Sequence, residues 1–143
     1  MRLYLDLNCF NRPFDDQRDE RVRSETEAIF SILHRIVEGT DSLVWSVALT
    51  FENARHPKRD RGAEIALWQR RAAVTARASS DVEHRARVIA ATGISPLDAA
   101  HLACAEAGAA GVACIRAIFE DPEPARAAAR ILAAIQGGGA KAG

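Results

Sequence analysis

The chain has few cysteines, no net charge and no long hydrophobic run. Its three cysteines form no C-x-x-C pair, which argues against both a disulfide framework and a cysteine zinc site. No apolar run approaches the ~18 residues that a membrane span requires. Asp6 also interrupts the start of the chain, where a signal peptide needs an apolar stretch. We therefore expect a cytoplasmic protein that is neither exported nor embedded in a membrane.

Charge and size give only broad limits. The 19 Lys and Arg residues balance the 19 Asp and Glu residues, so the whole-chain charge neither supports nor excludes a nucleic-acid partner. Only a local basic patch could attract phosphates. With 143 residues, of which 48% are hydrophobic, the chain is long enough for one domain with a buried core.

Hydrophobic spacing predicts strands that alternate with helices. Residues 8–16 are expected to form a loop and residues 137–143 a flexible tail, while Ser95 and Gly108 are expected to cap the two ends of one helix. This alternation favours an α/β fold with a parallel sheet, in which sites form beyond the carboxyl ends of the strands. The expected strands cover residues 3–5, 43–47 and 112–115 (112–119 if the last continues), and the expected helices cover residues 21–38, 48–55, 59–77, 81–91, 96–107 and 125–135.

Three carboxylates stand at the ends of expected elements: Asp6, Glu52 and Asp98. If the fold brings them together, they form an oxygen-rich site of the kind that binds a hard divalent cation. Each acid also has an ordinary interpretation. Glu52 suits the exposed face of an amphipathic helix, and Asp98 suits a first helical turn, where it would favour the helix dipole by ~0.3 to 1 kcal/mol.

Each acid lies in a longer motif, and the three motifs together resemble those of PIN-domain proteins in order and spacing. They read DLNCFNRPFDD at residues 6–16, SVALTFE at residues 46–52 and PLDAAHLA at residues 96–103. The resemblance covers residues 1–108. It implies a three-layer α/β/α PIN-like fold with a short parallel sheet flanked by helices, as a single domain over residues 1–136.

The resemblance also implies a function. PIN-domain proteins of this kind are metal-dependent endoribonucleases that use Mg²⁺ or Mn²⁺, often as the toxin of a VapC-type toxin–antitoxin pair. Asp6, Glu52 and Asp98 would be the metal ligands, and Asn8 would hold a carboxylate or a water. The metal would activate the attacking water and neutralise charge on the phosphate. A cognate antitoxin and homodimerisation follow from the resemblance alone. The alternative is a PIN-like module that binds RNA or a protein partner without cleavage.

The motif pattern breaks down after residue 108. The family usually supplies a fourth acid there, but Ala110 and Arg116 fall at the two Asp positions. Arginine is always charged and presents only donors, so Arg116 is no metal ligand. Glu120 and Asp121 are the nearest substitutes, although four or five further residues of strand would place them ~13 to 17 Å beyond the usual position. Residues 110–136 are therefore atypical, and one hypothesis is a shift of reading frame near Ala110.

His101 follows Asp98 by three residues, so the two side chains share one helix face. His101 is expected either to support the acid or to be a packed polar residue under the sheet.

Basic residues near the first two acids are candidates for binding an RNA backbone, because phosphate contacts are made chiefly by Arg and Lys. The alternative is that these basic residues simply form a solvent-exposed surface. The candidates are Arg12, Arg55, Lys58 and Arg59.

Overall fold

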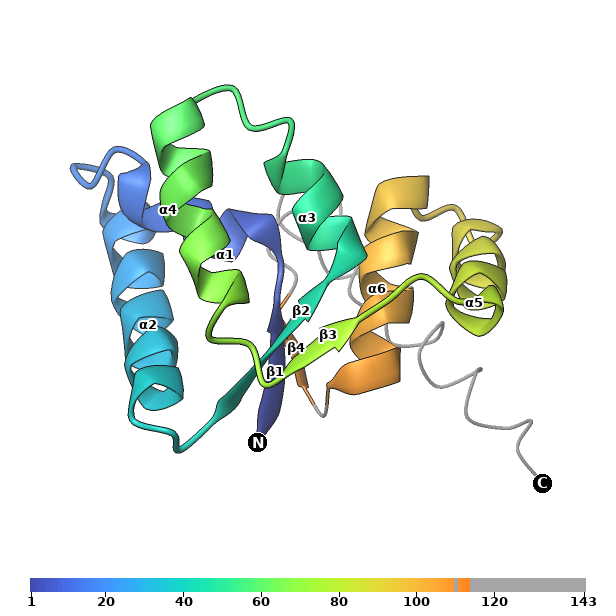
Figure 1. Ribbon diagram of the computed structural model, residues 1–143. Coiled ribbons are helices and arrows are strands. Elements are labelled where there is room, and N and C mark those ends of the chain that lie inside the picture. The colour runs from blue at the N-terminus through green and yellow to red at the C-terminus, as the bar shows by residue number, and fades with distance from the viewer. Residues whose placement is uncertain (110, 114–143) are drawn as a thin grey trace.

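The computed structural model describes residues 1–109 and 111–113 of the chain. Strands and helices alternate along this part of the protein, which is therefore an α/β structure (Figure 1). The strands are β1 (Arg2–Leu5), β2 (Ser42–Ser46), β3 (Val74–Ala76) and β4 (Gly111–Ala113). The helices are α1 (Leu7–Asn11), the 3₁₀ helix η1 (Arg12–Phe14), α2 (Glu20–Val37), α3 (Val47–Asn53), α4 (Arg59–Gln69), α5 (Ser80–Ala90) and α6 (Pro96–Gly108).

The four strands form one parallel sheet in the order β3-β2-β1-β4. The chain builds the sheet outward from β1 to β3 and then returns to the other side of β1 for β4. Because parallel crossovers are right-handed, this reversal puts α5 and α6 on the face opposite to α2 and α4, as Figure 1 shows. The strand order therefore reverses between β1 and β4, and ligands of open α/β sheets bind at the carboxyl edge beside such a point.

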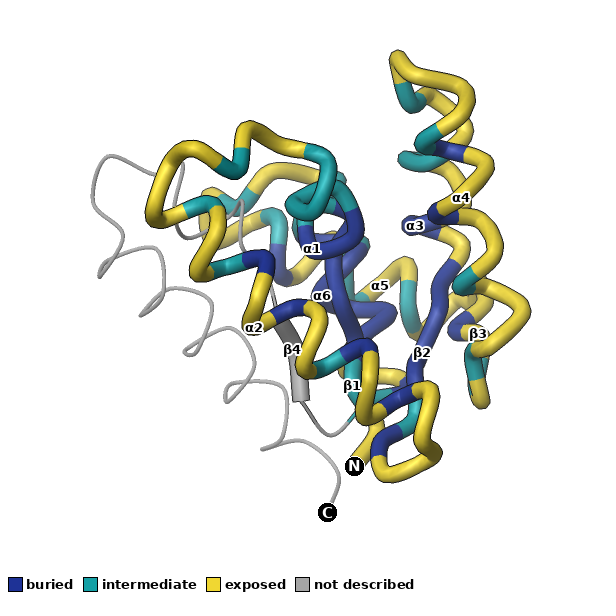
Figure 2. Tube along the Cα trace, turned by 90° about the vertical axis from the view of Figure 1, so that its left-hand side faces the viewer, coloured by how far each residue is buried: buried dark blue, intermediate teal, exposed yellow. Residues whose placement is uncertain are grey.

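The core lies on both sides of β1 and β2, which are more deeply buried than β3 (Figure 2). Helix α2 is amphipathic and covers one face with a buried stripe, while a second apolar cluster joins α5 to α6. The principal core residues are Tyr4, Leu5, Leu43, Val44, Trp45, Ile29, Leu33 and Ile36, and the second cluster comprises Ile89, Ala99, Leu102 and Ala103.

Besides α1, which Asp6 caps, four helices begin at a side chain that accepts a backbone N–H, which satisfies donors that the first turn leaves unpaired. The capping residues are Asp19, Ser46, Ser79 and Ser95. The predicted helices at 21–38, 48–55, 81–91 and 96–107 are confirmed with ends shifted by at most two residues. The predicted strands at 3–5 and 43–47 are confirmed in the same way.

Two predictions of helix and loop positions are wrong. Residues 8–16 contain α1 and η1 rather than a loop, because Asp6 caps a short turn that buries Leu7, Cys9 and Phe10. The helix predicted over residues 59–77 ends at Gln69, and the chain then forms β3 beside β2. Sheet pairing thus overrides the helix propensity of an alanine-rich segment.

Gly108 does not cap α6 from outside; it is the last helical residue. A Cβ at this position would lie 2.9 Å from Val44 Cγ1, which is too close for any real contact. Glycine is therefore required for the close approach of α6 to β2 rather than for a left-handed turn.

Several predictions lie outside the described residues. They concern the continuation of β4 beyond residue 113, the helix at 125–135, the tail at 137–143 and the positions of Arg116, Glu120 and Asp121. The extent of a domain over residues 1–136 likewise stays a prediction. Across the described part of the chain, no helix combines the length and apolarity that crossing a membrane would need.

Candidate functional site

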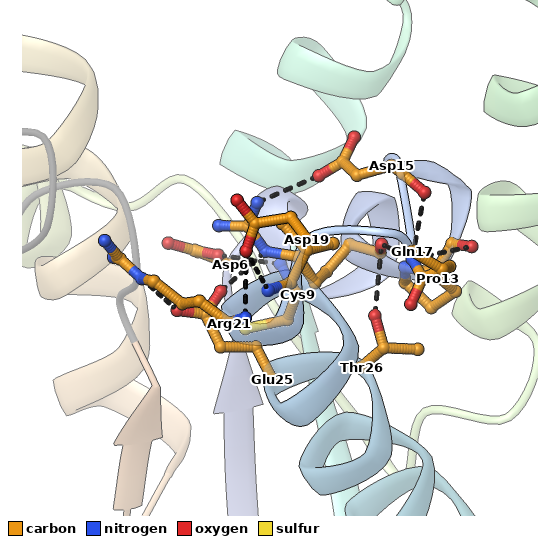
Figure 3. A network of polar contacts seen from close by, with 11 residues as sticks. Asp6, Cys9, Pro13, Asp15, Gln17, Asp19, Arg21, Glu25 and Thr26 are labelled. Carbon is orange, nitrogen blue, oxygen red and sulfur yellow. Dashed lines mark hydrogen bonds and ion pairs between the residues drawn. The ribbon is translucent and has the colours of Figure 1, made fainter.

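Asp6 lies at the carboxyl end of β1, where the strand order reverses. Only 7% of the residue is exposed. Its Oδ1 accepts the backbone N–H of Cys9 at 3.1 Å, so the carboxylate is the N-cap of α1. Figure 3 draws Asp6 within the same network of polar contacts as Asp15 and Glu25. The first predicted acid is therefore a buried, oriented carboxylate rather than a solvated charge.

Glu52 is carried to the same edge of the sheet by α3, which starts directly after β2 because Ser46 caps it. Its Oε2 lies 3.0 Å from Nε2 of His101 on α6. The side chains are 16% and 4% exposed, respectively. Because a carboxylate only accepts, the imidazole N–H donates to Glu52. This contact joins the second sequence motif to the third.

Asp98 lies in the first turn of α6. That helix leads back to the start of β4, which runs parallel to β1, so the N-terminus of α6 faces the carboxyl edge of the sheet. The Ser95 hydroxyl donates to Asp98 Oδ2 at 2.6 Å and accepts the Asp98 backbone N–H at 3.2 Å. The predicted N-cap is confirmed, and it also orients the predicted ligand.

A buried polar chain lies beneath these acids. The Tyr4 hydroxyl is 2.6 Å from Nδ1 of His101 and 2.7 Å from Oγ of Ser46. Ser46 in turn accepts the Leu49 backbone N–H at 3.1 Å. Tyr4 and Ser46 have no solvent exposure, and His101 has 3%. The sequence predicts that His101 either supports Asp98 or is a packed polar residue. In the structure the imidazole is buried under α3, and it contacts Glu52 rather than Asp98.

Sequence reasoning missed Tyr4 and Ser46 as members of this cluster. One signal was available for each. Tyr4 precedes Asp6 by two positions and therefore shares its side of the extended chain. A serine at the end of a strand and the start of a helical segment is a typical N-cap, but the predicted strand ran one residue too far, to Val47.

The Cys104 thiol adjoins this network of contacts, since it forms a hydrogen bond with Ser46. Burial raises the pKa of the Cys104 thiol above its ordinary value, and hydrogen bonds with Ala48 and Ser46 oppose that shift less strongly. The thiolate is the reactive form of cysteine. The site therefore does not present Cys104 as a covalent nucleophile.

The predicted RNA-binding residues fall into two groups. Arg12 is paired with carboxylates, at 2.9 Å from Asp15 and 2.8 Å from Glu25, so its charge is already matched within the protein. Lys58 and Arg59 are exposed at the start of α4, and within residues 1–109 neither forms an ion pair.

Arg55 is also exposed, and its guanidinium carbon lies 3.5 Å from the ring centroid of Phe51. Phe51 itself is 53% exposed and lines an apolar groove of about 530 Å³ between α3, α5 and α6. An exposed aromatic ring beneath a guanidinium offers both charge and an apolar surface to a partner.

The chemistry of the candidate ligands favours a divalent cation, whereas their arrangement does not. Carboxylate oxygens, with the half-buried amide of Asn8 two residues after Asp6, are the ligand chemistry that Mg²⁺ and Mn²⁺ prefer. However, within the described residues no group of three or more His, Cys, Asp or Glu side chains is arranged to hold a metal ion. The structure brings Glu52 to His101, whereas a direct grouping of the three acids stays a prediction.

Comparisons of this chain with protein-family models, with curated proteins and with solved structures gave no match. The relation to PIN-domain proteins therefore remains the resemblance of three motifs.

Proposed function

We propose that this protein is a metal-dependent endoribonuclease of the PIN type, which hydrolyses RNA phosphodiester bonds. One observation carries the proposal: Glu52 and His101 meet at 3.0 Å, so the second and third motifs converge near the carboxyl edge where the buried Asp6 ends β1. Motifs separated by about fifty residues have no reason to converge there if they are unrelated surface segments.

The residues have distinct tasks in this proposal. Asp6, Glu52 and Asp98 would hold Mg²⁺ or Mn²⁺, with Asn8 beside them. Such a cation, when bound, activates water and neutralises charge on a phosphate. The chain's own contribution is to hold the acids: the Cys9 N–H fixes Asp6, Ser95 fixes Asp98 and His101 fixes Glu52. Preorganised carboxylates cost less to order when the cation and substrate arrive.

RNA would be gripped by Arg55, Lys58 and Arg59, which lie directly after the helix that carries Glu52. Their exposure suits contacts to phosphates, which position a nucleic acid without reading its sequence. Arg12 would act differently, by holding the segment after α1 through Asp15 and Glu25. The motif resemblance extends the proposal to a cognate antitoxin and a homodimer, and the cysteine usage extends it to a cytoplasmic location.

The test is RNA cleavage by the purified chain with Mn²⁺, compared with Asp6→Asn. Asparagine is as good an N-cap as aspartate, so this change removes the charge while it preserves α1. We expect cleavage to fall at least ~100-fold in Asp6→Asn and to stop in EDTA. Asp81→Asn, which changes an exposed acid in the first turn of α5, is the matched control and should cleave normally. Cleavage that survives EDTA, or that is unchanged in Asp6→Asn, rejects the proposal.

A second candidate is a PIN-like module that binds RNA or a protein without cleavage. Two observations favour it: Glu52 is already engaged by His101, and no three-residue metal group is arranged within the described residues. The apolar groove beside Phe51 would suit the side chains of a protein partner. Retained RNA or partner binding, with neither cleavage nor a heat of Mn²⁺ binding, would select this candidate.

A further inference from the structure

The Tyr4 hydroxyl is linked to Glu52 through the ring of His101. Tyr4 comes from β1, has no solvent exposure and places its hydroxyl oxygen between Oγ of Ser46 and Nδ1 of His101. A buried hydroxyl is expensive unless it is hydrogen-bonded, and this one has a partner on each side. Phenylalanine would supply the same apolar ring, so the hydroxyl is the part of Tyr4 that requires an explanation.

We propose that Tyr4 is a positioning residue that holds the His101 ring so that its Nε2–H points at Glu52. Glu52 only accepts, so the ring nitrogen at 3.0 Å must carry hydrogen. The other nitrogen, Nδ1, is the atom that Tyr4 contacts at 2.6 Å. A hydrogen bond at one ring nitrogen fixes the tautomer and orientation of the whole imidazole.

One assignment of hydrogens satisfies every member of this chain. The Leu49 N–H donates to Ser46, the Ser46 hydroxyl donates to Tyr4, and the Tyr4 hydroxyl donates to Nδ1 of the neutral ring. The Nε2–H of His101 then donates to Glu52. This series of hydrogen bonds begins at the N-terminus of α3, passes through β1 and α6, and returns to α3 at Glu52. It therefore fixes the carboxylate relative to three separate elements.

Removal of the Tyr4 hydroxyl would leave Nδ1 of a 3% exposed ring without its partner. A neutral imidazole can then place its hydrogen on Nδ1 or turn within the site, and either change withdraws the donor from Glu52. That Glu52 must be held for metal binding rests on the proposed function. That Tyr4 fixes the ring does not, because the geometry is present without any metal.

The experiment is ¹⁵N NMR of the histidine rings in the metal-free full chain, for the wild type and Tyr4→Phe. The ring of His101 is identified by the loss of its signals in His101→Gln. We expect hydrogen on Nε2 of His101 in the wild type and a measurable loss of the Nε2–H population in Tyr4→Phe. An Nε2 without hydrogen in the wild type, or ring signals unchanged in Tyr4→Phe, overturns the proposal.

Thr26→Val is the matched control, because Thr26 is also a buried hydroxyl residue and donates to the Arg12 carbonyl oxygen at 3.3 Å, away from His101. A purely structural role for Tyr4 predicts the same ring signals in both variants. If Tyr4→Phe does not fold, Ser46→Ala removes the donor to Tyr4, and it should also weaken the hold on the ring.

A Mn²⁺ titration separates this proposal from the proposed function. Loss of a residue that orients a ligand typically costs 10- to 100-fold in metal affinity, so Tyr4→Phe should bind Mn²⁺ about 10-fold more weakly than the wild type. If the wild type neither binds Mn²⁺ nor cleaves RNA, the proposed function fails, while the NMR result still decides the role of Tyr4.

Discussion

Glu52 and His101 are separated by 49 positions in the sequence, yet Oε2 of the first lies 3.0 Å from Nε2 of the second. The contact ties α3 to α6, the two helices that carry the second and third acidic motifs. It also occupies an oxygen that the metal hypothesis would use, so Glu52 must accept both an imidazole N–H and a cation if the protein is a nuclease. The contact therefore supports the convergence of the motifs. It also means that cation binding by Glu52 must be tested directly.

Ser95→Ala should separate helix stability from metal binding. The Ser95 hydroxyl caps α6 and also donates to Asp98, whereas the Ser79 hydroxyl caps α5 by accepting the Val82 N–H. Either serine-to-alanine change should lower the free energy of unfolding by about 1 kcal/mol, measured in urea. Only Ser95→Ala should also weaken Mn²⁺ binding. Equal Mn²⁺ affinity in the two variants would mean that the Ser95 hydroxyl does not orient a ligand.

Arg59→Ala and Arg12→Ala should affect RNA binding differently. Arg59 is exposed, so its loss should weaken RNA binding and reduce the slope of log affinity against log salt by about 0.7 for a single-stranded ligand. Arg12 is paired with Asp15 and Glu25, so its loss should lower stability and leave the salt slope unchanged. Salt titrations by fluorescence anisotropy measure both slopes, and a reversed order would contradict the assignment.

Asp41 makes stability depend on acid pH. The Arg35 guanidinium, at 2.7 Å, and the amino group of Met1 lower the pKa of Asp41 from 3.8 to about 2. A lowered folded-state pKa stabilises the fold above the ordinary value, and this contribution disappears as the pH falls from 3.8 to about 2. Asp41→Asn should therefore be less stable than wild type at neutral pH, with a difference that shrinks across this window.

Denaturant unfolding at several pH values measures that difference. Glu27→Gln, an exposed change within α2 at a residue without an ion pair in the described structure, is the control and should show a constant offset. A gap between wild type and Asp41→Asn that does not shrink below pH 3.8 would contradict the pairing.

The long amphipathic helix and the capped start of α6 could be predicted because local rules decide them. The stripe of α2 has helical spacing, and Ser95 followed by Pro96 marks a start on its own. Strand β3 could not be predicted, because its three residues become a strand only through pairing with β2. The function of Gly108 was equally hidden, since the neighbour that forbids a side chain is Val44, far away in the sequence.

The candidate site also has a part that local sequence predicts and a part that it does not. The positions of Asp6 and Asp98 at element ends follow from local sequence, and the structure places both at such ends. The partner of Glu52 and the burial of Tyr4 depend on the packing of α3 and α6 against the sheet, which no local pattern specifies. The pairing of Arg12 with Glu25 likewise arises because α2 turns back along η1.

The most direct test of the metal site is calorimetric titration of the metal-free protein with Mn²⁺. We predict one binding event in the wild type, affinities reduced at least ~10-fold in Asp6→Asn and in Glu52→Gln, and an unchanged affinity in Asp81→Asn. The absence of any binding heat in the folded wild type, or equal affinities in wild type and Asp6→Asn, would contradict the account.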